Sequence, residues 1–290
     1  MGGIIDKITE FIKELLQGWV LTNFKTMFTD VNDKVGTIAG EVSKTPSTWN
    51  SGIFDMIKTL SDNVMIPIAG MIISFVLVYE LISMVIDKNN LHDFNTAIFI
   101  RFFMKACIAV MLLSKTFDIV MAVFDVGSHI VNSAAAAISG ETSIDVSSTL
   151  QTMFNEQFSE MSIGELLGLG METMIVSLCM KIMSVLITVI LYGRMIEIYL
   201  YVSVAPVPCA TVTNREWGTI GTNYFKGLCA LAFQGFFMMV CVAIYAVLVA
   251  GVAVSDNLHT ALWSVAAYTV ILCFSLFKTG SLSKSIWNAH

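Results

Sequence analysis

The stretch FKGLCALAFQGFFMMVCVAIYAVLVAGVAV, residues 225–254, decides the fold class of this chain. Lys226 is its single charged residue. A helix of about 20 apolar residues crosses the hydrocarbon core of a bilayer, and it satisfies all of its backbone hydrogen bonds internally. These residues therefore predict a membrane-spanning helix.

Four other stretches have the same character and complete a set of five predicted spans. They are residues 64–86, 94–114, 171–204 and 261–277. The composition agrees, because 56% of the residues are hydrophobic and 13% are charged, whereas soluble domains carry about 25% charged residues. We predict an all-α, polytopic membrane protein with about five transmembrane helices.

The N-terminal residues predict an amphipathic helix instead of a span. Apolar residues recur there at helical spacings of three and four: Ile4, Ile5, Ile8, Phe11, Ile12, Leu15, Leu16, Trp19 and Val20. A membrane-surface helix normally carries Lys and Arg on its polar face, but here three acids outnumber two lysines. We therefore favour packing on a protein surface, such as a second copy of the chain, over interfacial binding. The contact candidates are Ile8, Phe11, Leu15 and Trp19.

Two further segments complete the predicted organisation. Residues 117–131 carry a second amphipathic stripe, opposite Asp118, Asp125 and His129. Residues 36–52 have the Ser, Thr, Gly and Pro content that is typical of a connector.

Charge predicts the orientation of the chain. Short loops rich in Lys and Arg stay in the cytoplasm, and residues 116–172 contain no Lys or Arg but eight acids. We expect an extracytoplasmic amphipathic N-terminal region (1–62), two spans (63–114), an acidic extracytoplasmic loop (115–170) and three further spans (171–290). The loop 205–224 and the C-terminus would be cytoplasmic. Six lysines before residue 64 oppose an external N-terminus.

Five charged residues fall inside the predicted spans: Glu80, Arg101, Lys105, Arg194 and Glu197. Each ionisable group at membrane depth costs roughly 2.5–3.5 kcal/mol on insertion scales, so it needs a partner or water. Their similar predicted depth indicates one charged belt near the cytoplasmic side, with Glu80 facing Arg101. Lys181, nearer the outer end, does not fit this belt. The belt is either a set of structural ion pairs or a polar lining for a pore or coupling site.

Enzyme chemistry finds no support in the sequence. No GxSxG, HExxH or P-loop pattern occurs. The four histidines are far apart and the six cysteines lack CxxC spacing, so we expect no metal site and no cofactor. The net charge of −6 argues against direct, sequence-specific binding of nucleic acid.

The region after the third predicted span resembles a known family. It reads YLYVSVAPVPCA (199–210), TVTNREW (211–217) and TNYFKGLCALAFQG (222–235). A long helix ending at two prolines, a short polar loop with a tryptophan, and a helix carrying a glutamine are similar to the TrbL-type channel subunits of conjugation and type IV secretion machines. The motif residues are Pro206, Pro208, Trp217, Asn223, Tyr224, Lys226 and Gln234.

This resemblance implies five spans, an external N-terminus and a cytoplasmic C-terminus, as the charge pattern does. It also implies a homo-oligomer, for which we expect a pentamer, in the cell's inner membrane. The partners would be membrane lipids and other secretion subunits, including ATPases. We therefore predict a channel or scaffold subunit of a conjugative DNA-transfer machine. The alternatives are a small-solute transporter or ion channel, and a non-conducting scaffold.

Overall fold

The computed structural model describes residues 2–86, 96–138, 158, 161–252 and 257–289, and these residues form helices without any strand. The chain is therefore all-α, as predicted. It divides into two compact units. Unit 1 comprises Met1–Val42, Asn132–Leu191 and Phe237–Lys278, and unit 2 comprises Ser43–Val131, Tyr192–Phe236 and Thr279–His290. Of the predicted acidic loop (115–170), residues 139–157 and 159–160 lie outside the described residues.

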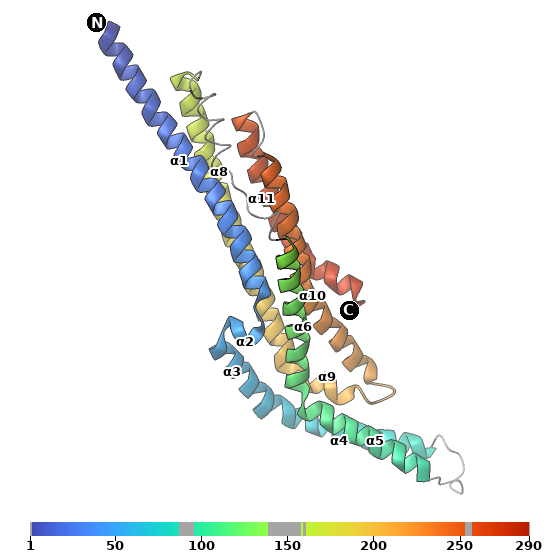
Figure 1. Cartoon of the computed structure of the whole chain (residues 1–290). Helices are drawn as coiled ribbons and strands as arrows, with labels where there is room; N and C mark the ends of the chain where they lie inside the picture. Colours follow the sequence, from blue (N-terminus) through green and yellow to red (C-terminus); the bar gives the residue numbers. More distant parts are fainter. Residues whose placement is uncertain (1, 87–95, 139–157, 159–160, 253–256, 290) are drawn as a thin grey trace. The chain divides into compact units, whose positions relative to one another are not determined.

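In unit 1, the N-terminal helix α1 (Gly2–Ser43) lies along α8 (Ile163–Val204) (Figure 1). Asn23 donates to Thr173 over 3.1 Å, and Lys34 donates to Ser184. In each pair the two partners are 150 residues apart in the chain. Because this offset is the same for both pairs, the two helices run parallel. The buried side of α1 follows a three-and-four spacing through Val20, Phe24, Met27, Val31, Val35, Ile38 and Val42.

The predicted connector over residues 36–52 therefore begins too early. Helix α1 continues to Ser43 because Ile38 and Val42 extend its buried stripe past Gly36 and Gly40. The chain leaves helical structure only at residues 44–45 and again at Asn50.

Two more helices, α10 (Gly218–Val252) and α11 (Leu258–Ile286), contribute to unit 1. Their parts within Phe237–Lys278 belong to it. The Tyr245 and Thr269 hydroxyls are 2.9 Å apart and tie α10 to α11. His259, at the start of α11, lies 2.8 Å from the Glu172 carboxylate on α8.

Unit 2 contains α2 (Pro46–Trp49), α3 (Ser51–Leu60), the π-helical turn η1 (Ser61–Met65), α4 (Ile66–Ile86), α5 (Thr96–Ser114) and α9 (Pro206–Thr211). It also contains α6 (Thr116–Ile138) as far as Val131. Its core joins α6, α8 and α10 through Phe117, Val120, Phe124, Met195, Ile198, Val202, Leu228 and Leu231. Gly127 permits close packing here, since a Cβ at this position would lie 3.0 Å from the Ala232 Cβ.

A π-helical turn adapts the first span to its proline. Pro67 lies inside one continuous helical stretch from Ser51 to Ile86, which α3, η1 and α4 form together. Inside a helix, proline has no N–H to donate and its ring clashes with the carbonyl four residues earlier. The wider turn fits this constraint, and the Ile66 N–H bonds to the Ser61 carbonyl.

Five helical stretches of the described residues are long and apolar enough to cross a membrane, in agreement with the predicted number. They are Ser51–Ile86, Thr116–Ile138, Ile163–Val204, Gly218–Val252 and Leu258–Ile286. Helix α6, predicted to be amphipathic, is among the five. The prediction that α5 is the second span stays a prediction, because too few of its residues are fully described. Apolar residues and the run Ala134–Ala137 raise the hydropathy of α6 despite its acids.

Candidate functional site

The turn between α8 and α10 is built by prolines and one asparagine. Helix α8 ends at Val204, and Pro206 begins α9, where the missing N–H of proline costs no helical hydrogen bond. The Asn214 side-chain oxygen then accepts from the backbone N–H groups of Glu216 and Trp217, over 2.8 and 2.9 Å. This cap orients the polar turn at residues 213–217 ahead of α10.

Glu80 is the charged centre of the site that this turn forms with α4 and α5. Its side chain is buried on α4 and forms an ion pair with Lys105 on α5. The Asn214 amide donates to the second carboxylate oxygen over 3.3 Å. A carboxylate at membrane depth is costly unless it is paired and hydrogen-bonded, and both requirements are met here.

Aromatic rings hold the turn against α4. Trp217 stacks on Phe75 and Tyr79, with ring centroids 5.4 and 5.5 Å apart. The Tyr79 hydroxyl donates to the Glu216 carboxylate over 2.7 Å. Trp217 therefore packs on α4 and fixes the turn to it.

A cavity of about 720 Å³ opens beside Glu80. Its lining combines two acids and two cations with polar and apolar neighbours: Tyr79, Glu80, Ser83, Met84, Ile86, Lys105, Arg215 and Glu216. The four charges balance, so the cavity offers donors and acceptors without a net charge. Among the described residues no cluster has the composition of a metal site. The arrangement is suited to holding water or a polar segment of a partner.

The structure divides the predicted belt into two groups. Glu80 pairs with Lys105, whereas Arg101, its expected partner, is exposed one turn earlier on α5. Sequence spacing places Arg101 and Lys105 on one helix face but does not set the register of α5 against α4, so the pairing was assigned one turn off.

The second group lies on α8 and α11. Glu197 accepts from Lys284 over 2.8 Å, and Arg194 is buried with a guanidinium Nε that has no hydrogen-bond partner. Among the described residues no ion pair joins this group to Glu80. Sequence reasoning missed Lys284 because the last span was ended at residue 277, whereas α11 continues to Ile286.

The motif residues have varied surroundings. The Tyr224 hydroxyl donates to the Tyr201 carbonyl over 2.8 Å, and the two rings stack. Gln234 is buried and donates to the Thr279 hydroxyl over 3.4 Å, an interhelical contact between α10 and α11. Asn223 is exposed, and Pro208 and Lys226 are half-buried. Burial raises the pKa of the nearby Cys209 thiol, more than its Thr116 hydrogen bond lowers it.

The oligomer-contact candidates all lie on α1 and are at least partly exposed within the single chain. Ile8, Phe11 and Leu15 are more than half exposed, and Trp19 is 39% exposed. The Trp19 ring packs over Gly170 of α8, where a Cβ would collide with it.

Comparison with known protein families gives a match. Residues 31–206, more than half of the chain, match the family described as TrbL/VirB6 plasmid conjugal transfer like protein. No curated protein and no solved structure shows significant similarity. The matched range includes Glu80, Lys105 and Pro206, whereas the motif residues from Pro208 onward lie beyond it. The chain is thus a multi-helix membrane protein that belongs to the TrbL/VirB6 family of conjugal transfer proteins.

Proposed function

We propose that this chain is a membrane subunit of a conjugative type IV secretion machine and forms a homo-oligomeric ring through or around which the substrate crosses the cell membrane. The family match over residues 31–206 carries this proposal. The five long apolar helices support it, since they suit a subunit that resides in the bilayer.

A ring of copies follows from size and from an uncovered surface. One chain of five spans is too small to enclose a path for a protein or for DNA, and closed symmetry is the usual arrangement of repeated copies. The apolar residues on the first turns of α1, including Ile8, Phe11 and Leu15, are exposed in the single chain. Exposed apolar patches of this kind mark interaction sites, and contact with the same helix of neighbouring copies would cover them. We expect a pentamer.

The orientation follows from charge. The acidic, Lys- and Arg-free stretch between α6 and α8 would lie outside the cell, together with the N-terminus, and the C-terminus would be cytoplasmic. The turn at residues 205–217 and the Glu80 cavity then face the side where partner ATPases supply energy. The chain itself performs no bond chemistry in this proposal.

A transfer assay tests the function. A cell that carries the conjugative element but lacks this chain should lose transfer, and the chain supplied from a second plasmid should restore it. Transfer that proceeds unchanged without the chain would contradict the proposal. Flux of a small solute into vesicles that contain only this protein would favour a transporter, the alternative class.

A further inference from the structure

The two parallel helices of unit 1 present opposite chemistry to their surroundings. The exposed side of α8 is mostly apolar, with Leu167, Met171, Met174, Ile175, Leu178, Ile182, Val185 and Val189. Lys181 and Thr188 are its exposed polar residues between 171 and 190. The exposed side of α1 beside it is polar or small, with Thr22, Lys25, Thr26, Thr29, Asn32, Asp33, Gly36, Thr37 and Gly40. We call the second set the polar face of α1.

These two surfaces lie at the same level of the bundle. Asn23 contacts Thr173 and Lys34 contacts Ser184, so residues 22–40 of α1 run beside residues 172–190 of α8. The apolar side belongs to a stretch long enough to cross a membrane. Whatever surrounds α8 at this level therefore also lies close to the polar face of α1.

One environment cannot suit both surfaces. A charged side chain that faces lipid near the bilayer centre is costly, and Lys25 and Asp33 are both exposed on α1. A continuous apolar strip in water, as on α8, carries the opposite cost, since its area remains unburied. Lipid on the α8 side and water on the α1 side satisfy both.

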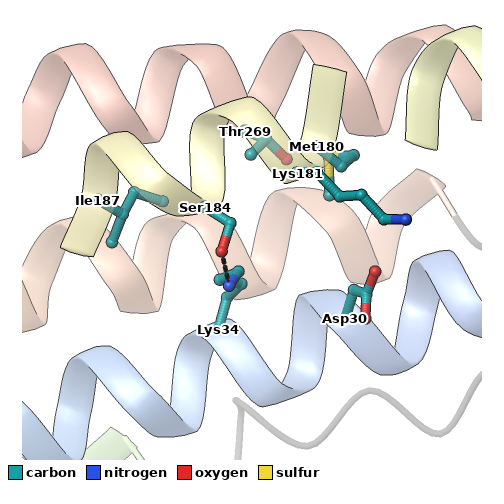
Figure 2. A pocket seen from close by; sticks show the side chains of 7 residues that line it. All are labelled: Asp30, Lys34, Met180, Lys181, Ser184, Ile187 and Thr269. Atoms are coloured by element: carbon teal, nitrogen blue, oxygen red, sulfur yellow. Dashed lines mark hydrogen bonds between the residues drawn. The ribbon is translucent and has the colours of Figure 1, made fainter. Parts of the chain in front are cut away.

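A polar cavity at the border between the helices supports this division. Figure 2 shows the lining of this cavity of about 190 Å³: Asp30 and Lys34 from α1, Met180, Lys181, Ser184 and Ile187 from α8, and Thr269 from α11. The Lys34 amine donates to the Ser184 hydroxyl (Figure 2). Lys181, which did not fit the predicted belt, lines this cavity beside α1. Lys181 and Ser184, the polar residues of α8 in this lining, thus lie beside α1.

We propose that the polar face of α1, residues 22–40, lines the aqueous path of the oligomer, while the exposed side of α8 borders lipid. This inference rests on the proposed ring of copies. Lys25 and Asp33 cancel in charge, so the face lacks the excess of cations that holds a polyanion. It suits passage of a hydrated polymer without tight binding. Because α1 runs parallel to α8, only about its first 20 residues would then extend outside the membrane. Helix α1 would add a crossing, so the start of α4 and the end of α5 would both lie on the cytoplasmic side, and the acidic stretch would stay outside.

Cysteine labelling in the full-length protein, in its native membrane, tests this wall. Two variants place a thiol on the polar face of α1, Thr29→Cys and Thr37→Cys. Two controls place one at matching levels on α8, Leu178→Cys and Val189→Cys. A charged, membrane-impermeant thiol reagent is added, and mass spectrometry of peptides separates each new thiol from the six native cysteines. We expect the α1 thiols to react at least roughly tenfold faster, because a thiol in lipid does not ionise to the reactive thiolate.

Each other pattern overturns the inference. Equal, fast labelling of both helices would place the pair in water outside the membrane. Slow labelling of both would place the polar face of α1 against lipid or protein. If Thr29→Cys is labelled fast and substrate transfer is undiminished after labelling, the polar face of α1 contacts water but does not line the path of the substrate. A single-chain mass for the extracted protein would instead refute the ring itself, whatever the labelling.

Discussion

Glu80 shows how a membrane helix tolerates a carboxylate. The charge is buried on α4, but a lysine from α5 and the Asn214 amide occupy its two oxygens. Removing one member of such a pair leaves the other charge without compensation, which is more damaging than losing a surface ion pair.

We therefore expect Lys105→Ala to destabilise the protein by about 1–3 kcal/mol, the usual cost of leaving a buried polar group unsatisfied. Thermal unfolding of the purified protein measures the change. Arg101→Ala is the matched control, because Arg101 is exposed one turn away on the same helix, and it should have little effect. A larger loss from Arg101→Ala than from Lys105→Ala would show that the pairing is wrong.

A charge exchange addresses the same pair in a second way. Glu80→Lys should destabilise the protein, since two cations then meet at the α4–α5 contact, and adding Lys105→Glu should restore part of the loss. Purely additive damage in the double variant, followed by yield and unfolding temperature, would mean that the two side chains do not interact.

At the scale of elements, the helices meet at a few positions where only glycine fits. Gly127 on α6 would place a Cβ 3.0 Å from the Ala232 Cβ and 3.1 Å from the Ala232 carbonyl oxygen on α10. Neither atom belongs to a flexible side chain, so one of the helices must shift to accept a larger residue.

Gly127→Ala should therefore lower stability by about 1–3 kcal/mol, as overpacking does. Gly193→Ala on α8 is the control, since nothing lies within 4 Å of a Cβ there. That change should stabilise the helix by up to about 1 kcal/mol through helix propensity. Equal unfolding temperatures for the two variants would contradict the close contact between α6 and α10.

The exposed apolar side chains in the first turns of α1 lead to a prediction about assembly. Phe11→Asp places a charge in the apolar stripe, where 62% of the Phe11 side chain is uncovered in the single chain. We expect the oligomer to weaken, as seen by native mass measurement. Lys7→Asp changes charge on the polar side of the same helix and should leave the oligomer intact. An unchanged oligomer in the Phe11→Asp variant would remove this helix from the interface.

The sequence predicted helices well where apolar stretches were long. It failed where contacts between helices determine the outcome. The long apolar stretches correspond to α4, α8, α10 and α11. About 20 consecutive apolar residues indicate a membrane-spanning helix and few other structures. Gly36 and Gly40 were assigned to a connector, but Ile38 is buried within unit 1, and its burial stabilises the helix through both glycines. Register between helices was also beyond sequence reasoning, so Glu80 was paired with Arg101 instead of Lys105.

For the whole molecule, the length of α8 limits how much of the chain the hydrocarbon core of a membrane can cover. Helix α8 has 42 residues, so at 1.5 Å per residue it is about 63 Å long. The hydrocarbon core is about 30 Å thick. A large part of α8 must therefore extend into water or lie beside other protein, and the family match supports a protein neighbour.

The ring is the central claim, and averaged images of the purified protein extracted with its lipids test it most directly. We predict particles with rotational symmetry, five copies of the 31.8 kDa chain around one axis. Particles that contain one chain and show no symmetry would contradict the account.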